Sequence, residues 1–277
     1  MAKLPDIPEL KIERRQSVLF VTLNRPEAKN ALNAAIVDGL MSLWEYLPTA
    51  DDVRAVVLRG AGGAFCAGGD IKDFGRQLMA PAPAPGAEDP VRAGNRAFGD
   101  LLSKMDAAPQ VLISLVEGPA FGGAMGFLSV SDVVIAGATA KFSLSETTLG
   151  LPPAQIGPFV VRKIGLFNAR RLALTGARFD AEEALRSGLV DSVVAETDLD
   201  PVLAAQLTAI GRCEPAALAA TKAILNRAAF AIEKDQLDDA ADAFCACLRG
   251  AGRDGAAAFA AKQQPPWVET YSTESEV

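Results

Sequence analysis

Two apolar runs in this chain are each followed by a glycine-rich turn, and this pairing limits the possible folds more than any other feature. The run at 55–58 leads into 65–71 (FCAGGDI), and the run at 111–116 leads into 117–124 (EGPAFGGA). Short apolar runs bounded by glycine are typical of buried strands. The second turn opens into an apolar stretch from Met125 that is typical of a helix. The pattern therefore predicts two buried strands that each end in a tight turn.

The backbone N–H groups of these turns are candidate hydrogen-bond donors, because glycine has no side chain to cover them. One N–H group from each turn could converge on a single carbonyl oxygen. Two donors in that arrangement hold the oxygen as negative charge develops on it, which is the property of an oxyanion hole. The alternative is that the glycines only permit tight turns.

Regular elements are predicted along the rest of the chain. Strands are expected at 10–12, 17–23, 55–59, 111–116, 133–136 and 189–194. Apolar residues in 34–47 recur at the helical spacing, which predicts a helix packed on a sheet. Strands and helices in repeated succession predict an α/β or α+β core. Alanine-rich helical patterns then dominate the C-terminal part, at 201–212, 215–233, 238–248 and 254–262.

The charge of the chain excludes some partners. The formal net charge is −7, and no run of lysine and arginine occurs, which argues against nonspecific binding of nucleic acid. No apolar run is long and uncharged enough to span a membrane, and residues 1–15 lack the apolar core of a signal peptide. We therefore expect a cytoplasmic protein with no nucleic-acid or membrane partner.

The absence of histidine narrows the chemistry. The four cysteines are scattered without a CxxC pair, so we expect no metal site and reduced, structural thiols. Every nucleophile arrangement that pairs serine or cysteine with histidine is also excluded. Proton transfer must then rest on a carboxylate, a thiol, a lysine, a tyrosine or water.

Five sequence blocks occur in the order and spacing of a known family. They are 24–26 with 30–32, 64–72, 118–126, 141–146 with 149–150, and 170–176 with 184–190. In these blocks the chain resembles the enoyl-CoA hydratase/isomerase, or crotonase, superfamily of acyl-CoA enzymes, and the resemblance covers nearly the whole chain. It implies an α/β (α+β) spiral of repeated ββα turns over residues 1–198, which carries the acyl-CoA site. Residues 199–277 would form a C-terminal helical region that supports trimer contacts, in a homotrimer or a dimer of trimers.

The resemblance also assigns roles to three residues in catalysis. The backbone N–H groups of Gly69 and Gly123 would be the two oxyanion donors. Glu146 matches the position whose carboxylate stands beside the α and β carbons of the substrate, where it acts as general base or acid. The alternative for a single glutamate is a solvated surface position.

Contacts with coenzyme A are expected in two stretches of the chain. The residues that match them are Arg25, Ala28, Lys29, Ala67, Gly68, Asp70, Ile71 and Lys72. The cations among them would meet phosphate groups, and the alternative is that they are solvated. Coenzyme A arrives as part of the substrate, so no separate cofactor is expected. The proline-rich segment 79–88 is predicted to be a loop, either bordering the acyl pocket or serving as a plain surface connection.

One position departs from the best-known hydratases of the family, which carry a second glutamate where this chain has Gly126. Three explanations are open. The protein could be an isomerase with one base, a hydratase in which Glu146 alone handles the water, or an acyl-CoA-binding homologue without turnover. Stretches 121–127, 142–150 and 153–161 resemble bacterial 3-methylglutaconyl-CoA and isohexenylglutaconyl-CoA hydratases, which favours the second explanation. Their substrates carry a second carboxylate that could position the water.

Overall fold

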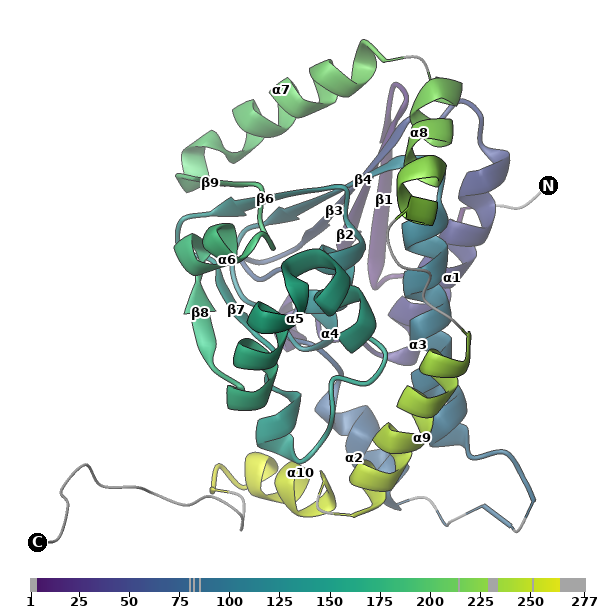
Figure 1. Ribbon diagram of the computed structural model, residues 1–277, viewed down its shortest axis with the longest axis vertical. Coiled ribbons are helices and arrows are strands. Elements are labelled where there is room, and N and C mark those ends of the chain that lie inside the picture. Colours follow the sequence, from purple (N-terminus) through teal and green to yellow (C-terminus); the bar gives the residue numbers. More distant parts are fainter. Residues whose placement is uncertain are drawn as a thin grey trace, which may run out of the picture.

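The computed structural model describes residues 4–79, 81, 83–84, 86–213, 215–228, 234–250 and 252–264, and a six-stranded sheet lies at the centre of this part (Figure 1). Its strands, in spatial order, are β1 (Leu10–Arg15), β2 (Val18–Leu23), β3 (Ala55–Gly60), β4 (Val111–Val116), β6 (Val133–Gly137) and β9 (Ser192–Val194). β1 and β2 form an antiparallel hairpin, and every other neighbouring pair is parallel. All six segments predicted as strands are therefore found in this sheet.

A second, three-stranded sheet was not predicted from the sequence. It is built from β5 (Ala120–Phe121), β7 (Lys141–Ser143) and β8 (Arg178–Asp180). β5 and β7 are parallel, and β7 and β8 are antiparallel. Strands of two or three residues are too short for an alternating pattern to be recognised.

Helices connect the strands, and some of them follow pairs of strands in a repeated order. The helices of this part are η1 (Pro26–Ala28), α1 (Ala34–Tyr46), η2 (Leu47–Thr49), α2 (Ile71–Met79), α3 (Pro90–Ala107), α4 (Gly123–Val130), η3 (Glu146–Leu149), α5 (Gly157–Thr175), α6 (Ala181–Ser187) and η4 (Glu196–Asp198). The successions β1-β2-α1, β4-β5-α4 and β6-β7-α5 are ββα turns. The predicted α/β spiral of such turns is thus confirmed.

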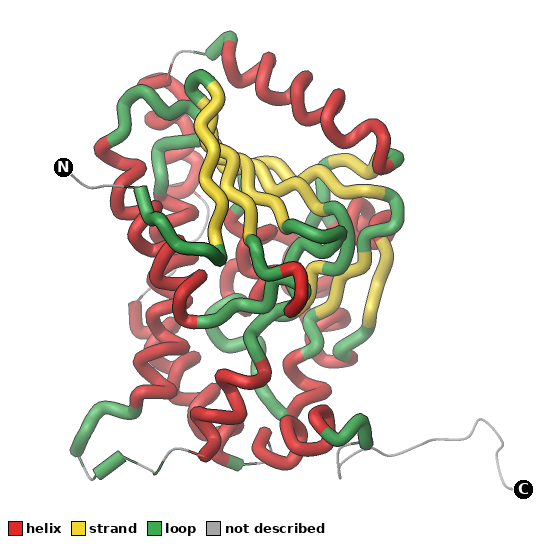
Figure 2. Tube along the Cα trace, turned by 180° about the vertical axis from the view of Figure 1, so that it is seen from behind, coloured by secondary structure: helices red, strands yellow, loops and turns green. Residues whose placement is uncertain are grey.

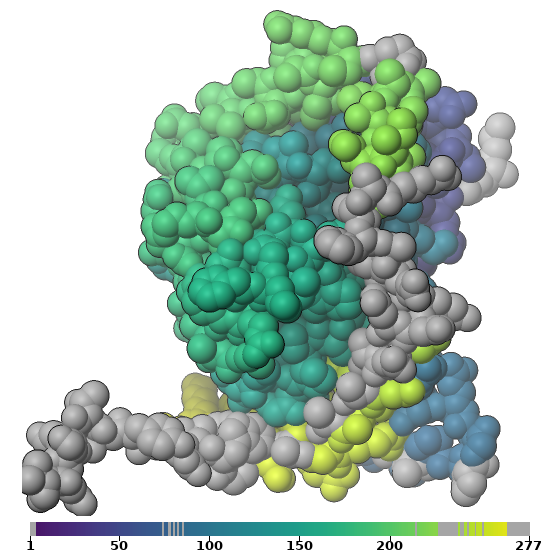
Figure 3. All heavy atoms as spheres, viewed as in Figure 1, coloured from purple at the N-terminus to yellow at the C-terminus, as the bar shows by residue number. Residues whose placement is uncertain are grey.

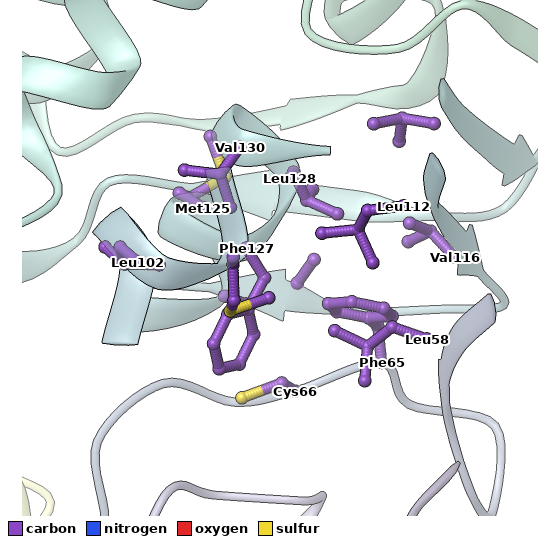
Figure 4. Packing of buried hydrophobic residues seen from close by; sticks show 14 of the residues in the cluster. Leu58, Phe65, Cys66, Leu102, Leu112, Val116, Met125, Phe127, Leu128 and Val130 are labelled. Carbon is purple, nitrogen blue, oxygen red and sulfur yellow. The ribbon is translucent and has the colours of Figure 1, made fainter. Parts of the chain in front are cut away.

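The inner strands β3 and β4 of the large sheet are buried on both faces, as β3 illustrates. Leu58 points into the main core beside Phe65, whereas its neighbour Val57 belongs to a cluster on the opposite face (Figure 4). Helices α1, α3, α4 and α5 contribute to the main core. α7 (Leu199–Gly211) covers the other face, and Figure 2 shows it crossing beside the strands. Burial on both faces explains why these strands are almost continuously apolar.

The remaining C-terminal helices lie near the first helices of the spiral. They are α8 (Pro215–Ala228), α9 (Lys234–Arg249) and α10 (Gly252–Ala260). α9 packs along α3, and α10 contacts both α2 and η3 (Figure 1). The predicted C-terminal helices are found with shifted ends, and residues 229–233 of the second one lie outside the described residues.

The connection between α2 and α3 contains the predicted proline-rich loop. Met79 is the last residue of α2, so the loop begins one residue later than expected. Its described residues, 81, 83–84 and 86–89, belong to no helix or strand, and residues 80, 82 and 85 lie outside the described part. None of the helices that the structure describes is long and apolar enough to cross a membrane.

Candidate active site

The two glycine-rich turns lie in direct backbone contact. The N–H of Phe121 donates to the carbonyl oxygen of Cys66 at 2.9 Å, and the N–H of Phe65 donates to the carbonyl oxygen of Pro119 at 3.1 Å. A Cβ atom placed on Gly68 would lie only 2.9 Å from the carbonyl oxygen of Phe121. The sequence therefore needs glycine at this position for the turns to meet.

Each predicted donor follows a glycine with positive φ. Gly68, which precedes Gly69, has φ 90°, and Gly122, which precedes Gly123, has φ 54°. Residues with a side chain rarely adopt this backbone region, so the two turns share a conformational requirement as well as a contact.

In the first turn, the N–H groups on either side of Gly69 are already used. The N–H of Gly68 donates to Sγ of Cys66 at 3.4 Å, and the N–H of Asp70 donates to the carbonyl oxygen of Leu32 at 2.9 Å. The N–H of Gly69 donates no hydrogen bond within the described part of the chain. It is therefore free to donate to a bound molecule.

The second turn also contains an N–H group without an acceptor, because a helix begins there. The N–H of Gly122 donates to the carbonyl oxygen of Ser143 at 3.0 Å. Gly123 is the first residue of α4, so its N–H has no carbonyl group one helical turn earlier. The N–H groups of Gly69 and Gly123, the two residues that the sequence singled out, are therefore both without an acceptor among the described residues.

The carboxylate of Glu146 lies where the turns meet. A Cβ atom placed on Gly122 would be 3.3 Å from Oε1 of Glu146 and 3.6 Å from the Cα atom of Gly68. Oε2 of Glu146 is buried and accepts no hydrogen bond from the residues that the structure describes. Burial raises the pKa of Glu146 to about 7, although a hydrogen bond to its own backbone acts in the opposite direction. A carboxyl group with this pKa can accept or return a proton at neutral pH.

The thiol in the first turn cannot replace Glu146 as a base. Burial raises the pKa of Cys66 to about 12, and the hydrogen bond from Gly68 only partly opposes this. The thiol therefore stays protonated at neutral pH. Within the described residues, no group of three or more cysteine, aspartate, glutamate or histidine side chains could hold a metal ion.

The residues predicted to contact coenzyme A lie on two adjacent segments. The N–H of Ala67 donates to the carbonyl oxygen of Lys29 at 2.9 Å, and the N–H of Leu32 donates to that of Gly68 at 2.8 Å. These bonds align 25–32 with 67–72. The structure thus brings together all eight residues: Arg25, Ala28 and Lys29 on the first segment, and Ala67, Gly68, Asp70, Ile71 and Lys72 on the second.

The three cations in this group have different surroundings. Lys29 and Lys72 are exposed, and neither forms an ion pair with a described residue. Arg25 instead donates from Nη2 to Oδ2 of Asp70 at 2.9 Å. Burial would raise the pKa of Asp70, but the hydrogen bond from Arg25 contributes to an overall lowering, so the pair is ionised at neutral pH.

Apolar side chains fill the space around Gly126, where a second glutamate would start. A Cβ atom placed there would lie 2.7 Å from Cγ2 of Ile156 and 2.9 Å from Cδ1 of Leu102. The site therefore has no second carboxylate at this position, and a side chain there would require Ile156 and Leu102 to move.

Two residues of the site were not singled out from the sequence. Asn30 is fully buried, its Oδ1 accepts the N–H of Arg25 at 2.9 Å, and its Nδ2 donates to the carbonyl oxygen of Ala64 at 2.7 Å. Phe98 of α3 borders the second turn, with its ring 3.5 Å from where a Cβ atom of Gly123 would lie. No local pattern indicates either contact, because the partners are distant in the sequence.

A spiral of ββα turns, with two glycine turns meeting beside a buried carboxylate, defines a crotonase-type α/β enzyme. Residues 13–270 match the family model described as enoyl-CoA hydratase/isomerase. The chain therefore belongs to the enoyl-CoA hydratase/isomerase family.

Known proteins with high similarity agree with this assignment. AtuE of Pseudomonas aeruginosa is 49% identical, with a TM-score of 0.76 over 94% of this chain and 100% of that one. An enoyl-CoA hydratase/isomerase from Marinobacter aquaeolei is 44% identical, with a TM-score of 0.77 over 94% of this chain and 99% of that one. The 2,3-dehydroadipyl-CoA hydratase of Escherichia coli is 33% identical over 221 residues, which are 79% of this chain and 82% of the relative.

Proposed function

We propose that this enzyme adds water to a 2-enoyl-CoA thioester, with Glu146 as its single acid–base group. The observation that carries this proposal is the position of Glu146. Its carboxyl group has a pKa of about 7 and lies at the contact between the two turns. A base held beside two backbone donors suits a reaction in which a proton moves while charge develops on a thioester oxygen.

The two turns would bind the thioester oxygen. The N–H groups of Gly69 and Gly123 would donate to it and become stronger partners as it gains enolate character. Their use is supported by the hydrogen bonds of the Gly68, Asp70 and Gly122 N–H groups, since the Gly69 and Gly123 N–H groups have no acceptor among the described residues.

Hydration then needs two proton transfers. The Glu146 carboxylate takes a proton from water as the water oxygen bonds to the β carbon, and the electron pair of the double bond moves toward the thioester to form the enolate. The protonated Glu146 next gives its proton to the α carbon, and the carbonyl group is restored. One H and one OH have then been added, and the carboxylate has returned to its starting state.

Coenzyme A would enter as part of the substrate, with no separate cofactor. Exposed Lys29 and Lys72 are the cations available for its phosphate groups, on the two segments that the first turn joins. Ala28, Ala67, Gly68 and Ile71 would lie beside the nucleotide and the pantetheine arm. These lysines would locally offset the repulsion between the phosphate groups and a chain whose net charge is −7.

We further propose that the acyl group is a β-branched glutaconyl group, as in 3-methylglutaconyl-CoA or isohexenylglutaconyl-CoA. Ile156 and Leu102 fill the space at Gly126, so a second protein carboxylate does not hold the water there. A carboxylate on the substrate would supply that contact. The dehydroadipyl group named for the Escherichia coli relative also has a second carboxylate, which supports this proposal.

The same geometry keeps one alternative reaction open. A Δ3,Δ2-enoyl-CoA isomerase needs a single base that removes a proton and returns it at another carbon, and Glu146 is a single base. An acyl-CoA-binding homologue without turnover is a further alternative, which any measured turnover excludes.

Incubation of the protein with a panel of thioesters in deuterated water tests these possibilities. The panel contains crotonyl-, longer 2-enoyl-, 3-enoyl-, 3-methylglutaconyl- and isohexenylglutaconyl-CoA, and mass spectrometry follows the products. We expect addition of one water, fastest with a glutaconyl group. Equal turnover of a simple enoyl-CoA of similar size would contradict the substrate proposal. A moved double bond without added water would show an isomerase, and no change in any thioester would contradict both activities.

We also propose that the chain forms a homotrimer or a dimer of trimers. Large apolar side chains are exposed on α5, where Phe167 is 79% exposed, and on α8, where Ile224 is 66% exposed. The surface formed by α5 is in view in Figure 3 (teal). Analytical ultracentrifugation tests this: a mass of three or six chains is expected, and a monomer at micromolar concentration would contradict it.

A further inference from the structure

Arg25 connects the segment 25–32 to the first glycine turn from inside the structure. Its Nη1 donates to the carbonyl oxygen of Ala31 at 2.7 Å, and its Nη2 donates to Oδ2 of Asp70 at 2.9 Å. The side chains of Arg25 and Asp70 are only 18% and 10% exposed. The guanidinium therefore lies between the two segments rather than on the surface.

Asp70 uses its second oxygen for the helix that follows the turn. Oδ1 accepts the N–H of Lys72 at 2.9 Å, at the beginning of α2. Both carboxylate oxygens of Asp70 are thus occupied, one by Arg25 and one by the helix. This fixes the residue that directly follows Gly69.

The peptide group that carries the Gly69 N–H is fixed from its other end. In a trans peptide the C=O and N–H point in opposite directions. The carbonyl oxygen of Gly68 accepts the N–H of Leu32 at 2.8 Å, so it points toward the segment 25–32. The N–H of Gly69 must then point away from that segment. The direction of this donor depends on how firmly Leu32 and the turn are held together.

Arg25 braces this connection on both sides of Leu32. It binds the carbonyl group of Ala31, directly before Leu32, and the carboxylate of Asp70, whose own N–H donates to the carbonyl oxygen of Leu32. We propose that Arg25 is a positioning residue that holds the Gly69 N–H in its donor direction, and that it is not a ligand of the coenzyme A phosphates. The inference rests on the proposed function where it takes Gly69 as the oxyanion donor.

The charges around Arg25 argue against a phosphate contact. Besides Asp70, Oε1 of Glu27 lies 3.9 Å from Nε of Arg25. A phosphate approaching the guanidinium would meet two carboxylates, and it would compete with a charged hydrogen bond that is already formed. Lys29 and Lys72 offer cations without such partners among the described residues.

A second ion pair in the molecule provides a matched control. Arg162 of α5 pairs with Asp106 of α3 through two hydrogen bonds, and the two side chains are 16% and 18% exposed. Replacing Arg162 removes an equally buried pair away from the turn. Arg25→Met and Arg162→Met should therefore lower the melting temperature by similar amounts, and only the first should affect the donor.

The test measures kcat and KM for a turned-over enoyl-CoA and the Kd of coenzyme A for both variants. We expect Arg25→Met to lower kcat by about 10- to 100-fold, less than the full loss of an oxyanion donor, with the Kd of coenzyme A changed less than about twofold. Arg162→Met should leave kcat within about twofold. Arg25→Lys should recover part of kcat, because lysine retains the charge and a donor.

Two results would overturn the proposal. One is a tenfold or larger loss of coenzyme A affinity in Arg25→Met with kcat unchanged, which would make Arg25 a phosphate ligand. The other is an equal effect of Arg25→Met and Arg162→Met on kcat, which would show a structural role only. Asp70→Asn is the second variant: it should lower kcat like Arg25→Met, and the double variant should be no worse than the more impaired single variant.

A readout without turnover separates this inference from the proposed reaction. The stretching frequency of a ¹³C-labelled thioester carbonyl, measured for bound acyl-CoA, reports the hydrogen bonds to that oxygen. We expect Arg25→Met to raise it toward the value in water and Arg162→Met to leave it unchanged. If the wild-type protein hydrates no thioester, the proposed function fails, while the frequency still tests the role of Arg25. Equal frequencies in both variants would contradict that role.

Discussion

The two glycine turns present the same donor through different supports. The first turn is held by polar contacts, with the Arg25–Asp70 ion pair and backbone hydrogen bonds to Leu32 around Gly69. The second begins a helix and is bordered by apolar side chains, because a Cβ atom on Gly123 would lie 3.0 Å from Cδ1 of Leu32 and 3.5 Å from the ring of Phe98. Charge and hydrogen bonding therefore hold the Gly69 N–H in place, whereas apolar packing holds the Gly123 N–H.

The two carboxylates of the site follow the same division. Asp70 belongs to the polar turn, and its pKa is lowered because the hydrogen bond from Arg25 and other donors outweigh its burial. Glu146 lies against the second turn without a cationic partner within the described residues, and burial raises its pKa to about 7. One small site thus keeps one carboxylate charged at neutral pH for structure and leaves another able to titrate for chemistry.

Glu146→Gln should have the largest effect on activity, because it removes the titrating group that faces both turns. Hydration should fall by about 10³-fold, since a glutamine cannot carry the proton. Steady-state kinetics measures the loss, and calorimetry with an acyl-CoA should show that binding is retained. Retained activity would contradict the role of Glu146.

Alanine at the two positive-φ glycines compares the turns directly. Gly68→Ala places a Cβ atom 2.9 Å from a backbone oxygen, and Gly122→Ala places one 3.3 Å from the Glu146 carboxylate. We expect activity to fall about 100-fold in both, because the donors shift, and a larger loss of stability for Gly68→Ala, because backbone cannot move aside as a side chain can. Chemical denaturation and kinetics would measure both effects, and unchanged activity in either variant would oppose a donor role for its turn.

Leu32 supports the first turn through its backbone and the second turn through its side chain, and Leu32→Ala removes only the second support. It keeps the backbone hydrogen bonds to the first turn and removes the side chain that packs against Gly123. The free energy of unfolding should fall by about 2–4 kcal/mol, as for other buried leucines. Amide hydrogen exchange should rise mainly in 122–126, and an equal rise in 67–72 would contradict the division between polar and apolar support.

The stability of the wild type and of Glu146→Gln should diverge with pH. The folded-state pKa of Glu146 is raised from 4.5 to about 7, so folding favours its neutral form. Its contribution to stability is complete below about pH 4.5 and is lost as pH rises through about 7, whereas glutamine shows no such loss. The variant should gain up to about 3 kcal/mol over the wild type across this range. A constant difference in denaturant unfolding at several pH values would refute this.

The rate of hydration should also depend on pH. As a base, Glu146 must be ionised, so kcat/KM should rise with pH up to about 7 and then level off. The rise should approach about tenfold per pH unit well below the pKa. A profile of kcat/KM that is flat between pH 5 and 8 would contradict the role of Glu146 as a base with this pKa.

Much of this architecture could be predicted from the sequence. The six segments predicted as strands all lie in the large sheet. The inner strands β3 and β4 could be recognised because burial on both faces makes them almost continuously apolar. The small sheet was missed, since the two residues of β5 and the three residues each of β7 and β8 carry no readable period.

The site likewise contains residues that could be predicted from the sequence and contacts that could not. Gly69, Gly123 and Glu146 could be singled out because they lie in short continuous motifs, and the structure brings their segments together. The partner of Arg25 could not, because Asp70 is 45 residues away and no local pattern pairs them. The contact of Arg25 with phosphates stays a prediction, and the ion pair with Asp70 is the observation that the sequence could not supply.

The carbonyl frequency of a bound, ¹³C-labelled enoyl-CoA reports directly on the proposed oxyanion hole. Glu146→Gln is the protein to use, because it should bind the thioester without converting it. If Gly69 and Gly123 both donate to the thioester oxygen, the stretching frequency must lie below that of the same thioester in water. A frequency equal to or above the value in water would show that the two turns do not form an oxyanion hole.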